Sequence, residues 1–175
     1  MAHSDDVLAF LLKDGGAIPN NPALPVLVYK KIGQGQTDEA RARWFETTWQ
    51  QHGWAAAWRW GVYDFPHYHS TAHEILGVFR GRASLRIGHE SGITVTVETG
   101  DMLVLPAGTG HQNLGSSGDF QVAGGYPKGQ QADLLRGEAG ERPQADERIR
   151  HVPLPSADPL HGPEGPLVTH WLKAE

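Results

Sequence analysis

The sequence predicts an all-β protein built as a single domain. From residue 61 onward, short apolar segments follow one another with turns rich in glycine, proline and aspartate between them, and this pattern is typical of β-sandwiches and barrels. Residues 93–97, Ile-Thr-Val-Thr-Val, alternate apolar and polar side chains, as a half-buried strand does. The length of 175 residues fits one core, with extra segments decorating a barrel.

Residues 1–36 are expected to form an N-terminal arm. Two apolar runs, Val7 to Leu12 and Val26 to Lys31, predict short strands. A segment rich in glycine, proline and asparagine separates them, so we expect the arm to lie on the larger body and to join its sheet.

Residues 37–53 predict one helix before the barrel. Thr37 can cap it, and Asp38 and Glu39 favour the positive end of a helix. The residues expected to face the core recur at intervals of three and four, and they are Ala40, Trp44, Phe45, Thr48 and Trp49. The helix is expected to end near Gly53.

Most of the tryptophans lie close together in the sequence. Five of the six fall between residues 44 and 60, namely Trp44, Trp49, Trp54, Trp58 and Trp60. We expect them to pack the helix against the barrel or to form a dimer interface. Stacking on a sugar is the alternative.

Residues 58–128 are predicted to form the barrel core, and residues 129–175 a proline-rich C-terminal wrap. The predicted core strands are Gly61 to His69, Glu74 to Phe79, Ala83 to Ile87, Ile93 to Val97, Met102 to Leu105, His111 to Leu114 and Phe120 to Ala123. Six of the twelve prolines follow Gly137, which favours an extended path. Leu167 to Leu172 is a candidate strand in this wrap.

Composition excludes several classes of function. A formal charge of −5 and a pI near 6 argue against nucleic acid as a partner. The apolar stretches are far shorter than the roughly 18 residues of a membrane helix, and the acidic amino terminus does not resemble a secretory signal. The absence of cysteine excludes disulfides and thiolate chemistry. We therefore expect a cytoplasmic protein that acts on a small molecule.

The most informative residues are His67, His69 and Glu74. On a strand, His67 and His69 would project from the same face, because side chains alternate with a period of two. Ser70, Thr71 and Ala72 allow a turn, and a second strand could then bring the carboxylate of Glu74 to the same ion.

A fourth candidate ligand is His111, which follows the turn in Gly100-Asp-Met-Leu-Val-Leu-Pro-Ala-Gly-Thr-Gly-His111. Three imidazoles and one carboxylate suit Fe, Mn, Ni, Zn or Cu without choosing among them. An octahedral ion would keep two positions for water, oxygen or substrate. In such a site Glu74 could also act catalytically, as a proton acceptor.

These residues resemble the two signatures of the cupin family. The first runs through Gly61, His67, His69, Glu74 and Gly81, and the second runs through Gly100, Pro106, Gly108 and His111. The family's second signature usually continues with an asparagine four residues after the histidine, where this chain has Gly115. The opening of the chain and its Gly125-Tyr-Pro-Lys-Gly turn look like the small single-domain bacterial cupins called YjlB-like.

The resemblance implies a double-stranded β-helix, or jelly-roll barrel, around one divalent transition metal per chain. Its protein ligands would be His67, His69, Glu74 and His111. Cupins commonly pair, so a homodimer is expected. The arrangement is similar to that of oxygenating cupins such as germin and quercetin and acireductone dioxygenases, which favours a dioxygenase-like oxidoreductase. A metal-dependent isomerase or lyase and a non-catalytic binding protein are the alternatives.

The remaining histidines are expected to be surface or core residues, and they are His3, His52, His89, His151, His161 and His170. His73 adjoins Glu74, so on a strand it faces the other way. We expect it to make an exterior hydrogen bond or a contact between subunits.

The same alternation indicates which residues line the substrate pocket. Tyr63 and Phe65 share a face with His67 on a regular strand, and Asn113 shares parity with His111. Gln121 and Tyr126, near the last predicted strand, complete the expected lining. A mainly apolar cavity would suit a small organic acid, enol, ketone or sugar derivative.

Overall fold

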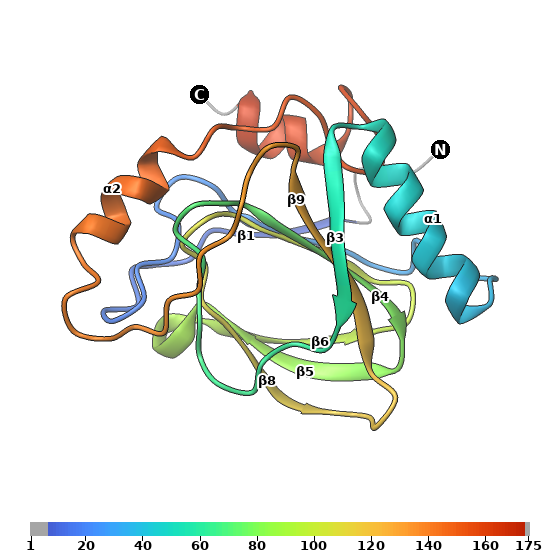
Figure 1. Cartoon of the computed structure of the whole chain (residues 1–175), viewed down its shortest axis with the longest axis horizontal. Helices are drawn as coiled ribbons and strands as arrows, with labels where there is room; N and C mark the ends of the chain where they lie inside the picture. The colour runs from blue at the N-terminus through green and yellow to red at the C-terminus, as the bar shows by residue number, and fades with distance from the viewer. Residues whose placement is uncertain (1–6, 174–175) are drawn as a thin grey trace.

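Two antiparallel sheets packed face to face form the body of the molecule (Figure 1). The computed structural model describes residues 7–173. The larger sheet has the strand order β1-β2-β7-β4-β9-β3, and the smaller has the order β6-β5-β8. This arrangement confirms the predicted all-β jelly-roll fold class.

The strands and helices follow one another along the chain with short connections, except between β1 and β2, before β4 and after β9. The strands are β1 (Val7–Phe10), β2 (Val26–Tyr29), β3 (Trp54–Trp60), β4 (Glu74–Arg80), β5 (Arg82–Ile87), β6 (Ile93–Glu98), β7 (Met102–Leu105), β8 (His111–Ser116) and β9 (Gln121–Pro127). The helices are α1 (Asp38–Gln51) and α2 (Gln144–His151), with a 3-10 turn at His89–Ser91 and a π-helical turn at Val168–Leu172.

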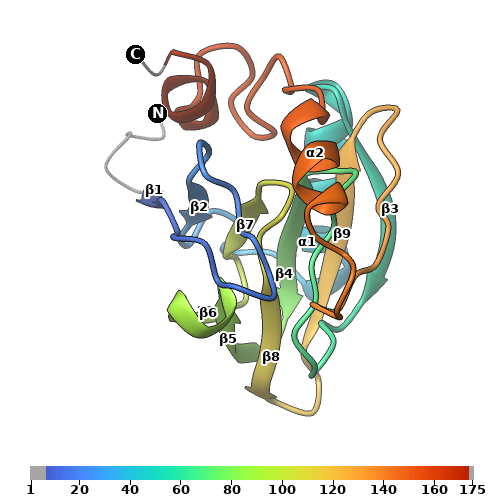
Figure 2. The ribbon, with the colours of Figure 1, turned by 90° about the vertical axis from the view of Figure 1, so that its left-hand side faces the viewer.

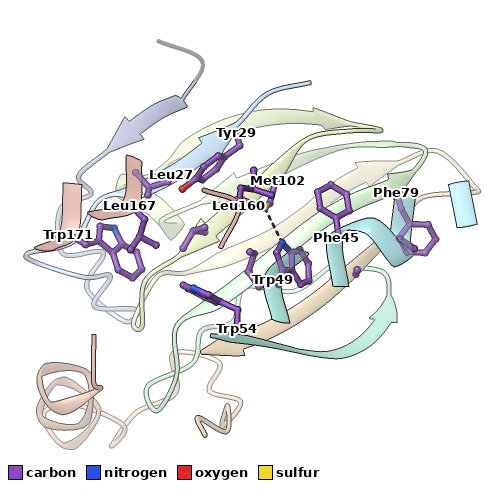
Figure 3. Packing of buried hydrophobic residues seen from close by; sticks show 14 residues of the cluster. Leu27, Tyr29, Phe45, Trp49, Trp54, Phe79, Met102, Leu160, Leu167 and Trp171 are labelled. Atoms are coloured by element: carbon purple, nitrogen blue, oxygen red, sulfur yellow. Dashed lines mark hydrogen bonds between the residues drawn. The ribbon is translucent and has the colours of Figure 1, made fainter. Parts of the chain in front are cut away.

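The central strands of the larger sheet are buried on both faces. Every residue of β2 and β7 is buried, and so are six of the seven in β4. One face packs on the smaller sheet, and the other is covered by α1 and the C-terminal segment (Figure 3). Strands covered on both sides need apolar residues at successive positions, which accounts for the unbroken runs Val-Leu-Val-Tyr and Met-Leu-Val-Leu.

Helix α1 covers the outer face of the larger sheet. Thr37 caps it as predicted, since its Oγ1 accepts a hydrogen bond from the backbone N–H of Ala40 at 3.2 Å. Phe45 and Trp49 are fully buried, and the indole N–H of Trp49 donates to the sulfur of Met102 at 3.3 Å (Figure 3). A Cβ at Gly77 would lie 2.7 Å from the Phe45 ring. Glycine at this position therefore allows the helix to approach the sheet.

The prediction of a strand over residues 61–69 is wrong. The strand lies earlier, as β3 over Trp54–Trp60, and residues 61–73 form a loop. Pro66 has no backbone N–H to contribute to a strand ladder. Two isolated bridges hold this loop, because His67 pairs with His111 and Tyr68 pairs with Leu135.

The C-terminal segment wraps the molecule and includes α2, a helix that was not predicted from the sequence (Figure 2). Ala145 and Ile149, four residues apart, are its buried residues, while acidic residues occupy its first turn and basic ones its last. That charge pattern is a helix signal. The candidate strand at Leu167 to Leu172 is also wrong. Leu167, Val168 and Trp171 are buried at helical spacing, and a helical turn satisfies that pattern better than a strand.

A buried carboxylate anchors the wrap. Asp158 is fully buried and accepts hydrogen bonds from the Tyr29 hydroxyl at 2.6 Å and from the backbone N–H groups of Leu160 and Leu167 at 2.8 and 3.0 Å. Burial and the neighbouring Asp158 charge raise the pKa of Tyr29 well above its usual value. The phenol therefore remains a donor, and it ties residues 158–167 to β2.

Candidate metal centre

Three imidazoles and one carboxylate meet at one end of the sandwich. His67 and His69 lie on the loop between β3 and β4, Glu74 begins β4, and His111 begins β8. The backbones of His67 and His111 exchange two hydrogen bonds, with N···O distances of 3.1 and 2.9 Å. This exchange brings candidate ligands from two distant parts of the sequence together.

His67 and His69 point the same way although they lie outside any strand. The chain is extended locally, because His67 bridges to His111 on one side and Tyr68 bridges to Leu135 on the other. Alternation over these few residues sends the Tyr68 ring into a separate apolar cluster and leaves the two imidazoles together.

Each imidazole is fixed through its Nδ1 atom by a backbone carbonyl. Nδ1 lies 3.0 Å from the Phe65 oxygen in His67, 2.5 Å from the Asp133 oxygen in His69, and 3.0 Å from the Thr109 oxygen in His111. A carbonyl can only accept, so each Nδ1 carries a proton and Nε2 is the nitrogen that each ring can offer to an ion. Such partners orient the histidine ligands of metal sites.

The donor atoms are close enough to share an ion. The candidate ligand nitrogens of His67, His69 and His111 lie within 4.8 Å of one another. Glu74 contributes Oε1 at 3.1 Å from His111 Nε2 and Oε2 at 3.3 Å from His69 Nε2. Cis ligands at about 2.1 Å from an ion are about 3 Å apart, so these residues fit a divalent transition metal after a small contraction.

The protonation of the metal-free centre follows from its charges. Burial by itself would lower the pKa of His69, but the Glu74 carboxylate and the Asp133 carbonyl raise it to about 9. Burial would likewise raise the pKa of Glu74, but the His69 and His111 imidazoles hold it well below its usual value. Burial and the neighbouring imidazoles lower the pKa of His67 to about 3. Near neutral pH the metal-free centre therefore holds a Glu74 carboxylate, a His69 imidazolium and a neutral His67 imidazole.

Residues 131–133, called the strap below, hydrogen-bond to the loop that carries His67 and His69. Ser70 donates its backbone N–H to Asp133 Oδ1 at 2.6 Å and its hydroxyl to Asp133 Oδ2. Thr71 Oγ1 accepts from the Asp133 N–H at 2.9 Å and donates to the Gln131 carbonyl at 2.7 Å. Arg148, on α2, donates to Ser70 Oγ at 2.8 Å. Asp133 therefore fixes both the histidine loop and, through its carbonyl, the His69 ring.

Replacing Asp133 by alanine should loosen the strap and weaken metal binding. Removal of its carboxylate frees Ser70, so the carbonyl that orients His69 shifts, and we expect an affinity about 10- to 100-fold lower, measured by competition with a chelating indicator. Asp133→Asn keeps an acceptor for the Ser70 N–H and should stay close to the wild type. Glu138→Ala, an exposed change farther along the same segment, is the control. Unchanged affinity in Asp133→Ala would show that the strap does not orient His69.

A cavity of about 250 Å³ opens above the histidines. Its lining consists of Trp58, Trp60, Gly61, Val62, Tyr63, His67, His69, Glu74, Leu76, His111, Tyr126, Ala132, Asp133 and Leu134. The donor set thus lies at the polar end of a mainly apolar pocket. Small-molecule sites commonly combine few polar groups with apolar walls in this way.

Two of the five residues expected to line the pocket do so, namely Tyr63 and Tyr126. Phe65 lies outside the lining because the loop replaces the predicted strand. Its ring stacks on Tyr63 at 4.7 Å, with the Arg136 guanidinium 3.8 Å from its centroid.

Asn113 and Gln121 also lie outside the lining. Asn113 accepts a hydrogen bond from the Gly115 N–H at 2.9 Å and donates one to Ser116 Oγ at 3.2 Å, so its amide hydrogen-bonds within its own strand. Gln121 is opposite Arg80 at the far end of β9. Other lining residues, among them Trp58, Leu76 and Asp133, were not predicted from the sequence, since their approach to the centre depends on long-range strand pairing and on the path of the C-terminal segment.

His73 faces away from the centre, as alternation predicts, but the expected exterior role is wrong. It is buried, its Nδ1 accepts the Ala107 N–H at 2.9 Å, and its ring packs against Trp171 at 5.0 Å. Burial lowers the pKa of His73 to about 4, so it is a neutral core residue. Among residues 7–173, His67, His69 and His111 form the metal-capable cluster, and His3 lies outside the described residues.

Several arginines near the motif are directed away from the cavity. Arg59 pairs with Glu39 and Glu46 at 2.9 and 2.7 Å, and Arg80 pairs with Asp38 at 3.2 Å. Arg82 and Arg86 lie on the exposed face of β5. Over the described part of the chain, the lining includes no lysine or arginine.

The chain is similar to the Bacillus subtilis (strain 168) protein YjlB, which is described as uncharacterized. The two are 38% identical over 164 residues, covering 94% of this chain and 96% of YjlB. No family model matches the chain. Within the described residues, none of the helices has the length and apolar character needed to cross a membrane.

Solved structures with similar folds are more distant. Bacillus subtilis oxalate decarboxylase, whose structure was studied for its Mn(II) centres, is 16% identical with a TM-score of 0.38, covering 66% of this chain and 28% of that one. Salicylate 1,2-dioxygenase from Pseudaminobacter salicylatoxidans is 13% identical with a TM-score of 0.32, covering 65% and 25%. A DUF861 family protein from Thermotoga maritima is 19% identical with a TM-score of 0.31, covering 47% and 85%.

Proposed function

The chain belongs to the YjlB-like cupins, and from this membership we propose that it is a metal-dependent oxidoreductase, of the dioxygenase type, acting on a small organic substrate. The observation that carries the proposal is the convergence of three Nε2 atoms and one carboxylate on the floor of an apolar cavity. A closed structural site would need no such cavity, whereas a catalytic site keeps open positions facing one.

The proposed roles follow from the chemistry of each side chain. His67, His69, His111 and Glu74 would hold the ion, which would supply open positions for a substrate oxygen and for dioxygen. Glu74 is buried and lines the cavity, so it can also accept a proton from the substrate when its bond to the ion loosens. The apolar walls exclude bulk water from the reacting groups.

The cavity lining disfavours a sugar-phosphate isomerase. A phosphate needs arginine, lysine or a cluster of backbone N–H groups, and the lining in residues 7–173 has neither arginine nor lysine. A non-catalytic metal-binding protein would share the same four ligands. It differs from an enzyme only in lacking turnover, so the two are separated by activity.

The proposal is tested by elemental analysis of protein purified without added metal, followed by oxygen-electrode measurements. We expect about one iron or manganese ion per chain, and oxygen uptake with some member of a panel of enols, phenols and thiols. Glu74→Gln is the matched variant, and it should lose oxygen uptake. Bound zinc with no oxygen uptake across the panel would overturn the oxidoreductase and leave the binding protein.

We also propose that the chain forms a homodimer. In the described residues β1 lies at the edge of the larger sheet, and Leu8 and Leu11 are 48% and 61% exposed. An antiparallel edge strand can pair with its own copy about a two-fold axis. Light scattering on the wild type and on a Leu8→Lys, Leu11→Lys double variant measures this, and a monomeric wild type contradicts it.

A further inference from the structure

Trp58 forms a fixed aromatic wall in the cavity, and its position depends on a glycine. A Cβ at Gly124 would lie 2.3, 2.4 and 2.6 Å from three atoms of the Trp58 ring. The indole therefore lies directly on the β9 backbone, at the place where a side chain would otherwise stand. Because Trp58 also lines the cavity, the part of the ring turned away from Gly124 borders the space above the centre.

A hydrogen bond holds the other edge of this indole. Its N–H donates to the Tyr126 hydroxyl at 2.9 Å, and the Tyr126 ring is edge-on to His69, with centroids 6.5 Å apart. The Tyr126 hydroxyl oxygen accepts this hydrogen bond, so the hydroxyl proton is directed away from Trp58. The Trp58 indole is thus held in place before any ligand binds, so ligand binding costs no conformational entropy to order it.

The size and charge of the cavity limit its ligand. A cavity of about 250 Å³ is larger than the roughly 150 Å³ cavity that accommodates benzene, and it leaves room for one ring with a small substituent. The mouth is apolar, since Trp60, Tyr63 and Leu134 are 66%, 41% and 47% exposed. With no lysine or arginine in the lining over residues 7–173, a negative ligand group has a partner only at the histidine end.

We propose that the ligand is a monocyclic aromatic molecule with two neighbouring oxygen donors at one end and no second charged group. Its ring lies against Trp58, and its oxygens face His67, His69 and His111. The placement of the oxygens rests on the proposed function, because it assumes an ion with two open positions. The placement of the ring rests on Trp58 and Gly124 alone.

Two probes with the same metal-binding group test the placement of the ring separately from the placement of the oxygens. Benzohydroxamate and cyclohexanecarbohydroxamate share a bidentate oxygen head and a six-membered ring, and only the first ring is planar. On zinc-loaded protein, calorimetry should give about tenfold tighter binding of the planar probe, because aromatic stacking contributes up to about 1.5 kcal/mol beyond burial. Trp58→Leu should abolish this ratio and leave zinc content unchanged. Trp44→Phe, a tryptophan change on α1, should preserve it.

Gly124→Ala gives a second route to the same result. It keeps the tryptophan but forces the indole off the strand, so it should also abolish the preference, including in the case that Trp58→Leu does not fold. Equal binding of the two probes by the wild type, or a preference that survives in a folded Trp58 or Gly124 variant, overturns the inference.

Failure of the metal centre itself has a different signature. If the wild type takes up no zinc, the proposed function fails, and the ring is then tested on metal-free protein with phenol and cyclohexanol. A preference for phenol that disappears in Trp58→Leu supports the aromatic wall independently of any ion. Equal affinity for the two overturns it.

Discussion

His69→Ala should remove most of the bound metal while leaving a folded protein. His69 is one of three candidate imidazole ligands, and supporting partners alone are worth about 10- to 100-fold in metal affinity, so loss of the ligand itself should cost at least about 100-fold. The core does not depend on His69, because the apolar clusters lie between the sheets and under α1. Mass spectrometry of metal content after dialysis, together with a thermal melt, measures both effects.

His151→Ala is the matched control. His151 is an exposed histidine on α2, so its loss should change neither metal content nor melting temperature. The Glu74 carboxylate in His69→Ala keeps His111 as a partner at 3.1 Å, which limits the destabilisation. Stoichiometric metal in folded His69→Ala would mean that the ion is held elsewhere and that the four-residue centre is wrong.

The meeting of the four side chains was predictable because short-range spacing and one turn carry most of the information. His67 and His69 need only a few extended residues to project together, and Glu74 needs only to begin the next strand. The turn before His111 brings its backbone against His67, where the two exchange hydrogen bonds. The predicted strand over residues 61–69 was unnecessary for this geometry, so its failure did not displace the ligands.

The walls of the pocket were not predictable in the same way. Trp58 reaches the cavity because β3 pairs with β9 and because Gly124 makes room for its ring, and neither fact is local in the sequence. Asp133 reaches His69 from 64 residues away through a C-terminal path with little periodicity. Asn113 has the expected parity, yet its amide hydrogen-bonds within its own strand. Short polar side chains often form such local hydrogen bonds in place of longer-range ones.

Metal uptake near neutral pH should release about one proton, and the affinity should fall as the pH falls. In the metal-free centre the pKa of His69 is raised to about 9, so its Nε2 is protonated at pH 7 and must lose that proton to bind an ion. The pKa of His67, about 3, keeps that ring neutral throughout. Below the His69 pKa the apparent affinity should drop about tenfold per pH unit, or about 100-fold between pH 8 and pH 6.

Calorimetry in buffers with different ionisation enthalpies counts the released proton, and Glu74→Gln identifies its source. Without the carboxylate, the pKa of His69 loses the charge that raises it, so at pH 8 the variant should release far less than one proton even though it binds metal more weakly. The slope of its affinity between pH 8 and pH 7 should flatten accordingly. If wild-type affinity is constant between pH 6 and pH 8, or if the variant releases as many protons as the wild type, the ion does not replace a His69 proton paired with Glu74.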